Sequence, residues 1–166
     1  KQDPKYVCDI YTLKKTNSGW TDLSKVSGPA NTEMHEGAGF LTLDRSNYFF
    51  TRWSTTNRNE CALYLSKNMN DKWLGAEKLN DNINLADYKT MHPSLSPDGS
   101  ILYFSSNRPG GFGKMDLWYV NLDDDSRPTG PPINMGPLFN TSEDEVTPFF
   151  HYYTSTLYFS SNGHPG

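Results

Sequence analysis

A repeat of about 54 residues constrains this chain more than any other feature, because repeated segments fold into repeated structural units. Residues 48–51 (YFFT) return as residues 102–105 (LYFS) and again as residues 157–160 (LYFS). The two steps are nearly equal in length. A unit of this length accommodates four short β-strands with their turns.

Two further sets of residues follow the same period. Residues 8–11 (CDIY) return as 61–64 (CALY) and 115–118 (MDLW), at nearly the same spacing as the first set. Trp20 returns as Trp73, again one period later. The second set follows the first at the same distance in both copies that contain the two, so the repeats share one phase.

One complete unit can be divided into strands. We expect an inner strand at residues 92–96, a turn at 97–100 (PDGS), and a second strand at 101–105, whose apolar run fits burial on both faces. A third strand is expected at residues 116–122 and a short outer strand at 132–135, where prolines favour a sheet edge. Helical periodicity is absent, so we expect almost no α-helix.

These patterns predict an all-β chain, a β-propeller of four-stranded antiparallel blades. Residues 1–166 form a single segment with blade parts at 1–34, 35–89, 90–144 and 145–166, about three blades' worth. The first blade part is expected to open on a third strand at residues 6–13. Propellers close with roughly four to eight blades. We therefore favour part of a larger propeller; the alternative is that the two half-blades join within an unusually small ring.

Charge and hydropathy exclude several classes of partner. The net charge is -4 and no basic cluster occurs, so we expect no nucleic-acid partner. No apolar stretch is long enough to cross a bilayer. Residues 1–6 lack the apolar core of a signal peptide, so any export signal is expected to have been removed or to lie outside this chain.

Residues 92–111 (HPSLSPDGSILYFSSNRPGG), followed by 116–118 (DLW), resemble the WD40-like repeat of TolB-type propellers. Residues 132–136, 139–141 and 144–148 are similar to the propellers of Bacteroidota OmpA-family and PorE-type envelope proteins of the type IX secretion system. This resemblance implies a periplasmic or outer-membrane-associated scaffold that helps to anchor or assemble a secretion or gliding complex. Its partners would be cell-envelope proteins, with peptidoglycan bound through a domain absent from this chain.

Candidate chemical motifs fail on their context. The glycine-rich residues 108–114 (RPGGFGK) precede a predicted strand, whereas a phosphate-binding loop needs a helix there. The His35-Glu36 pair lacks a second histidine one helical turn later, and no Gly-x-Ser-x-Gly elbow occurs. We therefore predict no metal, no cofactor and no enzyme. The alternative is the propeller domain of a serine peptidase or of a carbohydrate-active enzyme.

A partner surface is expected at one end of the strands. The loops that join outer to inner strands and those that join second to third strands share that end. Aromatic and arginine side chains on rigid loops are good contact anchors. The candidate partner-binding residues are Glu36, Arg52, Trp53, Arg108, Phe112, Lys114 and Glu145.

Acidic residues also recur at equivalent positions, as Glu36 with Glu145 and as Asp9 with Asp116. We expect them first to accept backbone N–H bonds that tie loops together, with ion or ligand binding as the alternative.

Two cysteines, Cys8 and Cys61, occupy the same place in successive units. Sheets pack roughly 10 Å apart, which exceeds the Cα separation of about 7 Å that a disulfide tolerates. We therefore predict two free, buried thiols.

Overall fold

The computed structural model describes residues 6–28, 30–57, 59–70 and 72–165. This part of the chain contains fifteen β-strands and no helix, which confirms the predicted all-β class. All pairings between the named strands are antiparallel. Residues 1–5, which belong to the segment checked for a signal peptide, lie outside the described residues.

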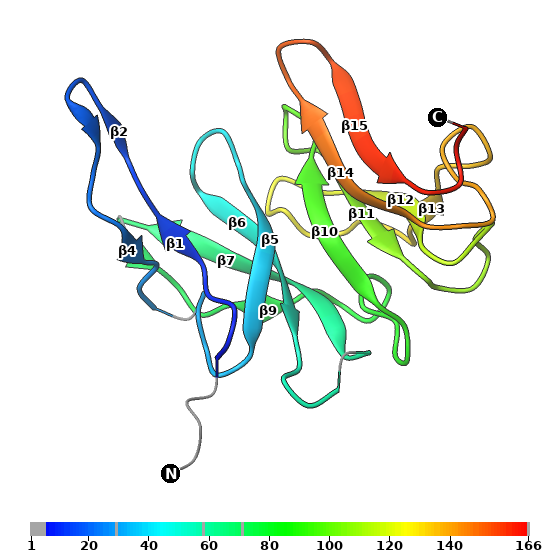
Figure 1. Ribbon diagram of the computed structural model, residues 1–166, viewed down its shortest axis with the longest axis horizontal. Helices are drawn as coiled ribbons and strands as arrows, with labels where there is room; N and C mark the ends of the chain where they lie inside the picture. The colour runs from blue at the N-terminus through cyan, green and yellow to red at the C-terminus, as the bar shows by residue number, and fades with distance from the viewer. Residues whose placement is uncertain (1–5, 29, 58, 71, 166) are drawn as a thin grey trace.

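One four-stranded sheet follows the predicted unit closely (Figure 1). Its strands pair in chain order, with the turn at residues 97–100 between the first two. The strands are β10 (Thr90–Leu95), β11 (Ile101–Ser106), β12 (Asp116–Asn121) and β13 (Ile133–Asn134). Each predicted strand is therefore present, with bounds close to those expected.

The sheet that precedes it in the chain has five strands. The strands β5, β6 and β7 pair in chain order, and the short strands β8 and β9 both pair with β7. Their bounds are β5 (His35–Leu41), β6 (Asn47–Trp53), β7 (Cys61–Met69), β8 (Lys72–Trp73) and β9 (Glu77–Lys78).

The ends of the chain form smaller sheets. A hairpin of β14 (Glu145–His151) and β15 (Thr156–Ser161) lies at the C-terminal side. The strand expected from residue 6 to residue 13 is reduced to β1, because only two of its residues pair with β4. The N-terminal strands are all exposed: β1 (Tyr11–Thr12), β2 (Lys15–Thr16), β3 (Gly19–Trp20) and β4 (Ser24–Lys25).

The first strands of the two larger sheets, β5 and β10, and of the C-terminal hairpin, β14, are interrupted at equivalent places. The register shifts between Gly37 and Phe40, and again at the two equivalent positions of β10 and β14. Each bulge contains one left-handed residue that is not glycine: Ala38 (φ 45), His92 (φ 57) and Thr147 (φ 54). A β-bulge inserts an unpaired residue and bends its strand. The repeat is therefore one of backbone geometry as well as of sequence.

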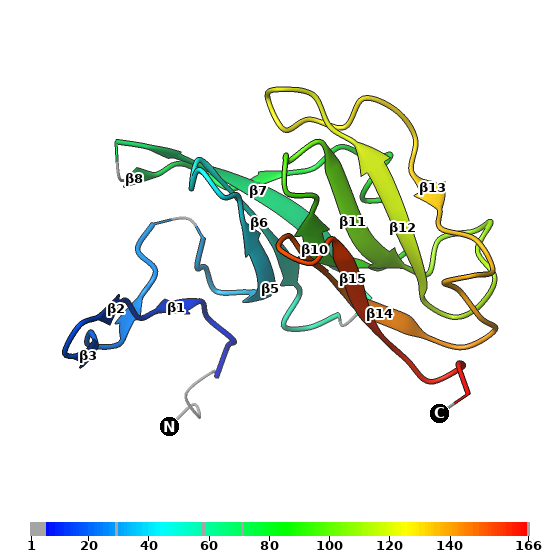
Figure 2. The same ribbon diagram turned by 90° about the horizontal axis from the view of Figure 1, so that it is seen from above.

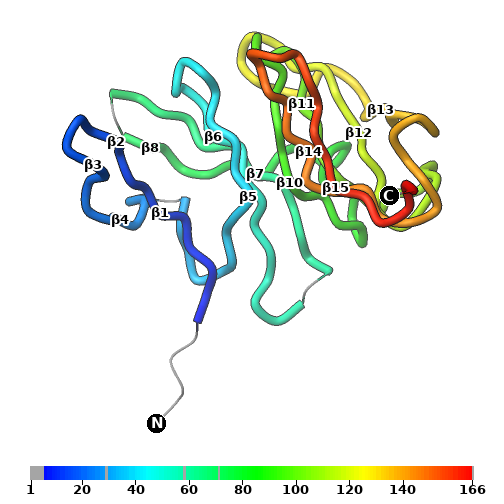
Figure 3. Tube along the Cα trace, turned by 45° about the horizontal axis from the view of Figure 1, so that its top comes forward, coloured from blue at the N-terminus to red at the C-terminus, as the bar shows by residue number. Residues whose placement is uncertain are grey.

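The main core lies between the two larger sheets (Figure 2). The strand β10 packs beside β5 on one side and beside β14 on the other, so the first strands of successive sheets are neighbours. Of the N-terminal strands, β1 lies nearest β5, and the β2–β3 hairpin extends away from it, at the opposite side of the molecule from β14 and β15 (Figure 3). The cluster comprises Phe49, Leu63, Leu65, Leu79, Ile83, Leu95, Leu102, Phe104, Trp118, Val120 and Leu122.

Candidate functional site

The loops of the predicted partner surface do meet at one end of the strands. We call this end the loop face and define it by residues 54–57, 79–89, 107–115 and 135–144. The backbone N–H of Lys114 donates to the carbonyl of Glu143 over 2.9 Å, and the two side chains form an ion pair. A loop between second and third strands therefore touches a loop that leads into the next first strand.

Arg52 and Glu36 form an ion pair beneath this face. Their side chains are 9% and 0% exposed, and the Arg52 Nε lies 2.8 Å from the Glu36 Oε1. The Arg52 guanidinium also lies 4.5 Å from the centre of the Tyr64 ring, a cation–π distance. The hydroxyl of Thr32 donates to the same carboxylate. Both charged groups are therefore engaged inside the protein.

Glu145 repeats the arrangement of Glu36 without an arginine. Its carboxylate is fully buried and accepts hydrogen bonds from the backbone N–H and the hydroxyl of Thr141, at 2.8 and 2.7 Å. The Ser161 hydroxyl donates over 2.6 Å. Although burial opposes ionisation, these donors hold the pKa of Glu145 below its ordinary value. The two glutamates thus fasten the chain that enters β5 and β14.

Arg108 is also buried, and it braces two segments against each other. Its Nη1 donates to the Asn82 carbonyl over 2.9 Å and its Nη2 donates to the Ile83 carbonyl. The guanidinium lies 4.9 Å from the centre of the Phe104 ring. Burial lowers the pKa of Arg108 to about 10, which still leaves it charged near neutral pH. Its polar groups point inward, toward the core cluster.

Of the seven predicted residues, three reach the surface. Phe112 is 52% exposed, Lys114 is exposed in its ion pair, and Trp53 is partly buried with its ring stacked on His35 at 5.4 Å. Trp53 lines a cavity of about 620 Å³ together with His35, Met91, His92 and others. Phe112 and Lys114 lie outside that cavity, so the structure does not gather the seven residues into one patch.

The glycine-rich loop is shaped around a buried aspartate. Asp116 accepts hydrogen bonds from the backbone N–H groups of Phe112 and Gly113, at 2.6 and 2.9 Å, and from the Asn134 side chain at 2.7 Å. A Cβ atom on Gly111 would lie only 2.7 Å from the Asp116 Oδ2. The repeated aspartate therefore ties the loop, as predicted, and the glycine allows its close approach. Its counterpart, Asp9, pairs with Lys25 at 2.8 Å.

Sequence reasoning missed three equivalent asparagines that act as clamps. The Oδ1 of Asn84 accepts the N–H of Leu63 over 2.8 Å, and its Nδ2 donates to the carbonyls of Leu63 and Leu79, both over 2.9 Å. Asn31 makes the same three bonds with Ile10 and Val26. Asn140 accepts the N–H of Leu117 and donates to the Leu117 carbonyl, and it also donates to the Oδ1 of Asn134. The spacing of these asparagines follows the period of the repeat, which was a usable signal.

The cysteine prediction is half right. Both thiols are free, but only Cys61 is buried, whereas Cys8 is exposed. Burial raises the pKa of Cys61 to about 11, so it is protonated near neutral pH. Cys8 lies just before β1. Among the described residues, the sheet of β1 contains only β1 and β4, so no first or second strand covers the Cys8 side chain.

Within the described residues, no group of three or more histidine, cysteine, aspartate or glutamate side chains could hold a metal ion. The same part of the chain has no helix with the length and apolarity to cross a bilayer. No protein-family model matches the sequence, and a search of curated proteins found no match.

Proposed function

We propose that this chain is an arc of a WD40-like β-propeller of the TolB type, with residues 35–89 and 90–144 as its two complete blades. Three repeated features support the proposal: the bulge in each first strand, the asparagine clamps, and the contact between successive first strands. Propeller blades meet through their inner strands around a common axis. Features that recur at equivalent positions suit a ring of equivalent blades.

The proposed role is that of a non-catalytic, protein-binding scaffold in the bacterial envelope. The observation that carries it is the division of side chains at the loop face: Glu36, Arg108 and Glu145 are buried and hydrogen-bonded, while Phe112 stands exposed on an anchored loop. Buried and satisfied charges hold loops in place, and exposed aromatic rings on fixed loops bind partners. The periplasmic or outer-membrane location, and a part in anchoring or assembling a secretion complex, rest on the resemblance carried by residues 132–136, 139–141 and 144–148.

An enzyme at this face gains no support. A glycan hydrolase needs two carboxylates that can reach the glycosidic bond. Glu36 and Glu145, the repeated candidates, are fully buried and already accept hydrogen bonds. The peptidase alternative places its catalytic domain outside this chain.

Site-specific photo-crosslinking in cells tests the proposal. A photoreactive phenylalanine analogue replaces Phe112 in the parent protein, and the same analogue replaces Trp20, an exposed ring on β3. We expect discrete crosslinked protein adducts from position 112 and none shared with position 20. Trp53→Ala should reduce the adducts at position 112, since its ring lies where β6 leads into the loop face.

Trp20→Ala is the matched control, because it removes an equally large ring far from the loop face. Thermal unfolding of each variant separates lost binding from lost structure. Position 112 giving no adduct, or the same adducts as position 20, would contradict a partner at this face. Arg108 is left unchanged in these variants because its removal would unpair buried groups.

A further inference from the structure

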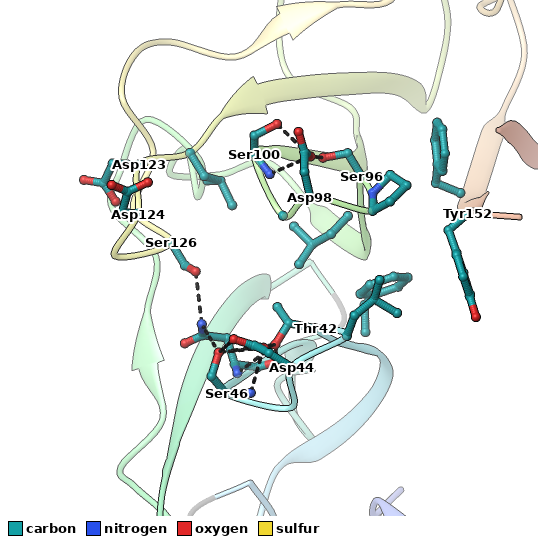
Figure 4. Close-up of a pocket in the computed structure, with 18 residues that line it drawn as sticks. Thr42, Asp44, Ser46, Ser96, Asp98, Ser100, Asp123, Asp124, Ser126 and Tyr152 are labelled. Atoms are coloured by element: carbon teal, nitrogen blue, oxygen red, sulfur yellow. Dashed lines mark hydrogen bonds between the residues drawn. The ribbon is translucent and has the colours of Figure 1, made fainter.

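A second concave site lies at the opposite end of the strands from the loop face (Figure 4). Its volume is about 390 Å³, within the range of roughly 300–1,000 Å³ that ligand pockets occupy. We call it the turn groove. Three turns form it, together with Phe40, Phe150 and Tyr152. The turn residues are 42–44 and 46–47 after β5, 95–100 after β10, and 122–124 and 126 after β12.

The turn groove has apolar walls. Leu95 and Leu122 are buried, and Phe40 and Phe150 are partly buried beside them. Tyr152 is 41% exposed at one side of the groove (Figure 4). These surfaces suit the aliphatic stem of a long side chain, because the transfer of apolar surface out of water is favourable.

The polar part of the groove is acidic. Asp44, Asp98, Asp123 and Asp124 line it, and no lysine, arginine or histidine does so among the described residues. Of the cations near the groove, Lys67 lies 3.9 Å from Asp125 and Arg127 lies 3.5 Å from Glu77. Arg45, in the turn between Asp44 and Ser46, is exposed and does not line the groove. The lining itself therefore carries negative charge and no positive charge among the described residues.

Hydrogen bonds favour the charged form of two of these carboxylates, Asp98 and Asp44. Hydrogen bonds from the Ser96 hydroxyl, and from the Ser100 N–H and hydroxyl, lower the pKa of Asp98 to about 2. All three of these bonds end on Oδ1, and no described residue donates to Oδ2. The pKa of Asp44 is lowered in the same way by Thr42 and Ser46. Asp98 Oδ2 is thus a charged acceptor with capacity to spare.

Asn47 adds an independent sign of a missing donor. Its Nδ2 donates to the hydroxyls of Ser46 and Ser126, at 2.9 and 3.2 Å. Its Oδ1 is buried and has no hydrogen-bond partner. Buried acceptors are ordinarily paired, so the Asn47 amide leaves one acceptor unsatisfied beside the groove.

We infer that the turn groove docks an arginine-bearing segment of a partner protein. A guanidinium supplies five N–H donors in a planar fork, which match several separate acceptors, and its plane can stack on an aromatic ring such as Tyr152. The three methylene groups of an arginine fit the apolar walls. This site is separate from the loop face and does not depend on the function proposed there.

Fluorescence anisotropy with the intact parent protein tests the inference. The probe is a fluorescein-labelled pentapeptide with a central arginine between leucine residues, and the reference probe carries citrulline in its place. We expect saturable binding of the arginine probe and binding at least ten-fold weaker of the citrulline probe. Asp124→Asn should weaken arginine binding roughly two- to five-fold, the effect of one exposed charge pair.

Asp81→Asn is the matched control, since Asp81 is exposed at the loop face, carries the same charge and does not line the groove. It should leave the affinity within error of the unmodified protein. A photoreactive leucine beside the arginine should crosslink to residues 95–100 or 122–126. Equal losses in the two variants, equal binding of citrulline, or crosslinks elsewhere would overturn the inference. So would putrescine or Ca²⁺ binding more tightly than the peptide.

Discussion

The asparagine clamps make stability depend on single side chains. Asn84 is buried and satisfies three backbone groups, so Asn84→Ala leaves those groups without a partner in the interior. We expect the free energy of unfolding to fall by about 2–3 kcal/mol. Urea unfolding followed by tryptophan fluorescence measures the change.

Asn31→Ala is the control for this prediction. Asn31 makes equivalent bonds but is only partly buried, so water can replace them. Its replacement should cost about 1 kcal/mol or less. An equal loss in the free energy of unfolding for the two variants would show that burial does not determine how much a clamp stabilises the protein.

Residue types predicted the site less well than the repeat predicted the strands. Arg108 and Arg52 stand in loops or at strand ends, where sequence reasoning expects solvent exposure. Their burial depends on carbonyl groups and a carboxylate that come from residues 16 to 26 positions away in the chain. No local pattern contains that information. The role of Asp116 was predictable because its partners in the glycine-rich loop are only three and four residues away.

At the scale of the element, the repeated bulge stores backbone strain that can be relieved. Ala38 has φ 45, a left-handed conformation that costs roughly 1–2 kcal/mol for a residue with a Cβ atom. Ala38→Gly should therefore stabilise the protein, by about 0.5–1 kcal/mol after the entropy of the unfolded chain is counted. Differential scanning calorimetry of the variant measures the change in stability.

Ala62→Gly is the matched control. Ala62 lies in the regular part of β7 and pairs with Arg52, so glycine there only loosens an ordered strand. We expect a loss of about 0.5–1 kcal/mol. A loss at position 38 as large as that at position 62 would contradict strain at the bulge.

Strands were predictable where turn chemistry and periodicity agree. The β10–β11 hairpin follows from its PDGS turn, in which Gly99 adopts φ 73. The strand at residues 6–13 was predicted too long, because a strand extends only as far as its pairing partner. Each short strand of this region pairs with one other short strand: β1 with β4, and β2 with β3. The bulges could not be predicted from composition, since Ala38, His92 and Thr147 share no side-chain property that favours a left-handed backbone.

At the scale of the whole molecule, the β10–β13 sheet and the β14–β15 hairpin each cover one face of the sheet before them. Phe49 in β6 is fully buried beneath the following sheet, and the equivalent Tyr103 stacks on Phe150 of β14 at 5.9 Å. The next equivalent residue, Tyr158 in β15, is 55% exposed. The ring at this position is covered by the next sheet in both β6 and β11, but it is exposed in β15. The exposed face of β15 is therefore suited to receive another sheet.

Hydroxyl-radical footprinting of the parent protein tests whether a further blade covers this face. If the propeller continues, Tyr158 and Phe149 should be labelled several-fold less than Tyr153, a 79% exposed ring at the β14–β15 turn. In the 166-residue chain alone, Tyr158 should approach the labelling of Tyr153, because both rings are then open to solvent. Tyr153 thus serves as the internal standard for exposure. Strong labelling of Tyr158 in the parent protein would mean that no sheet covers it, and the larger propeller would have to be given up.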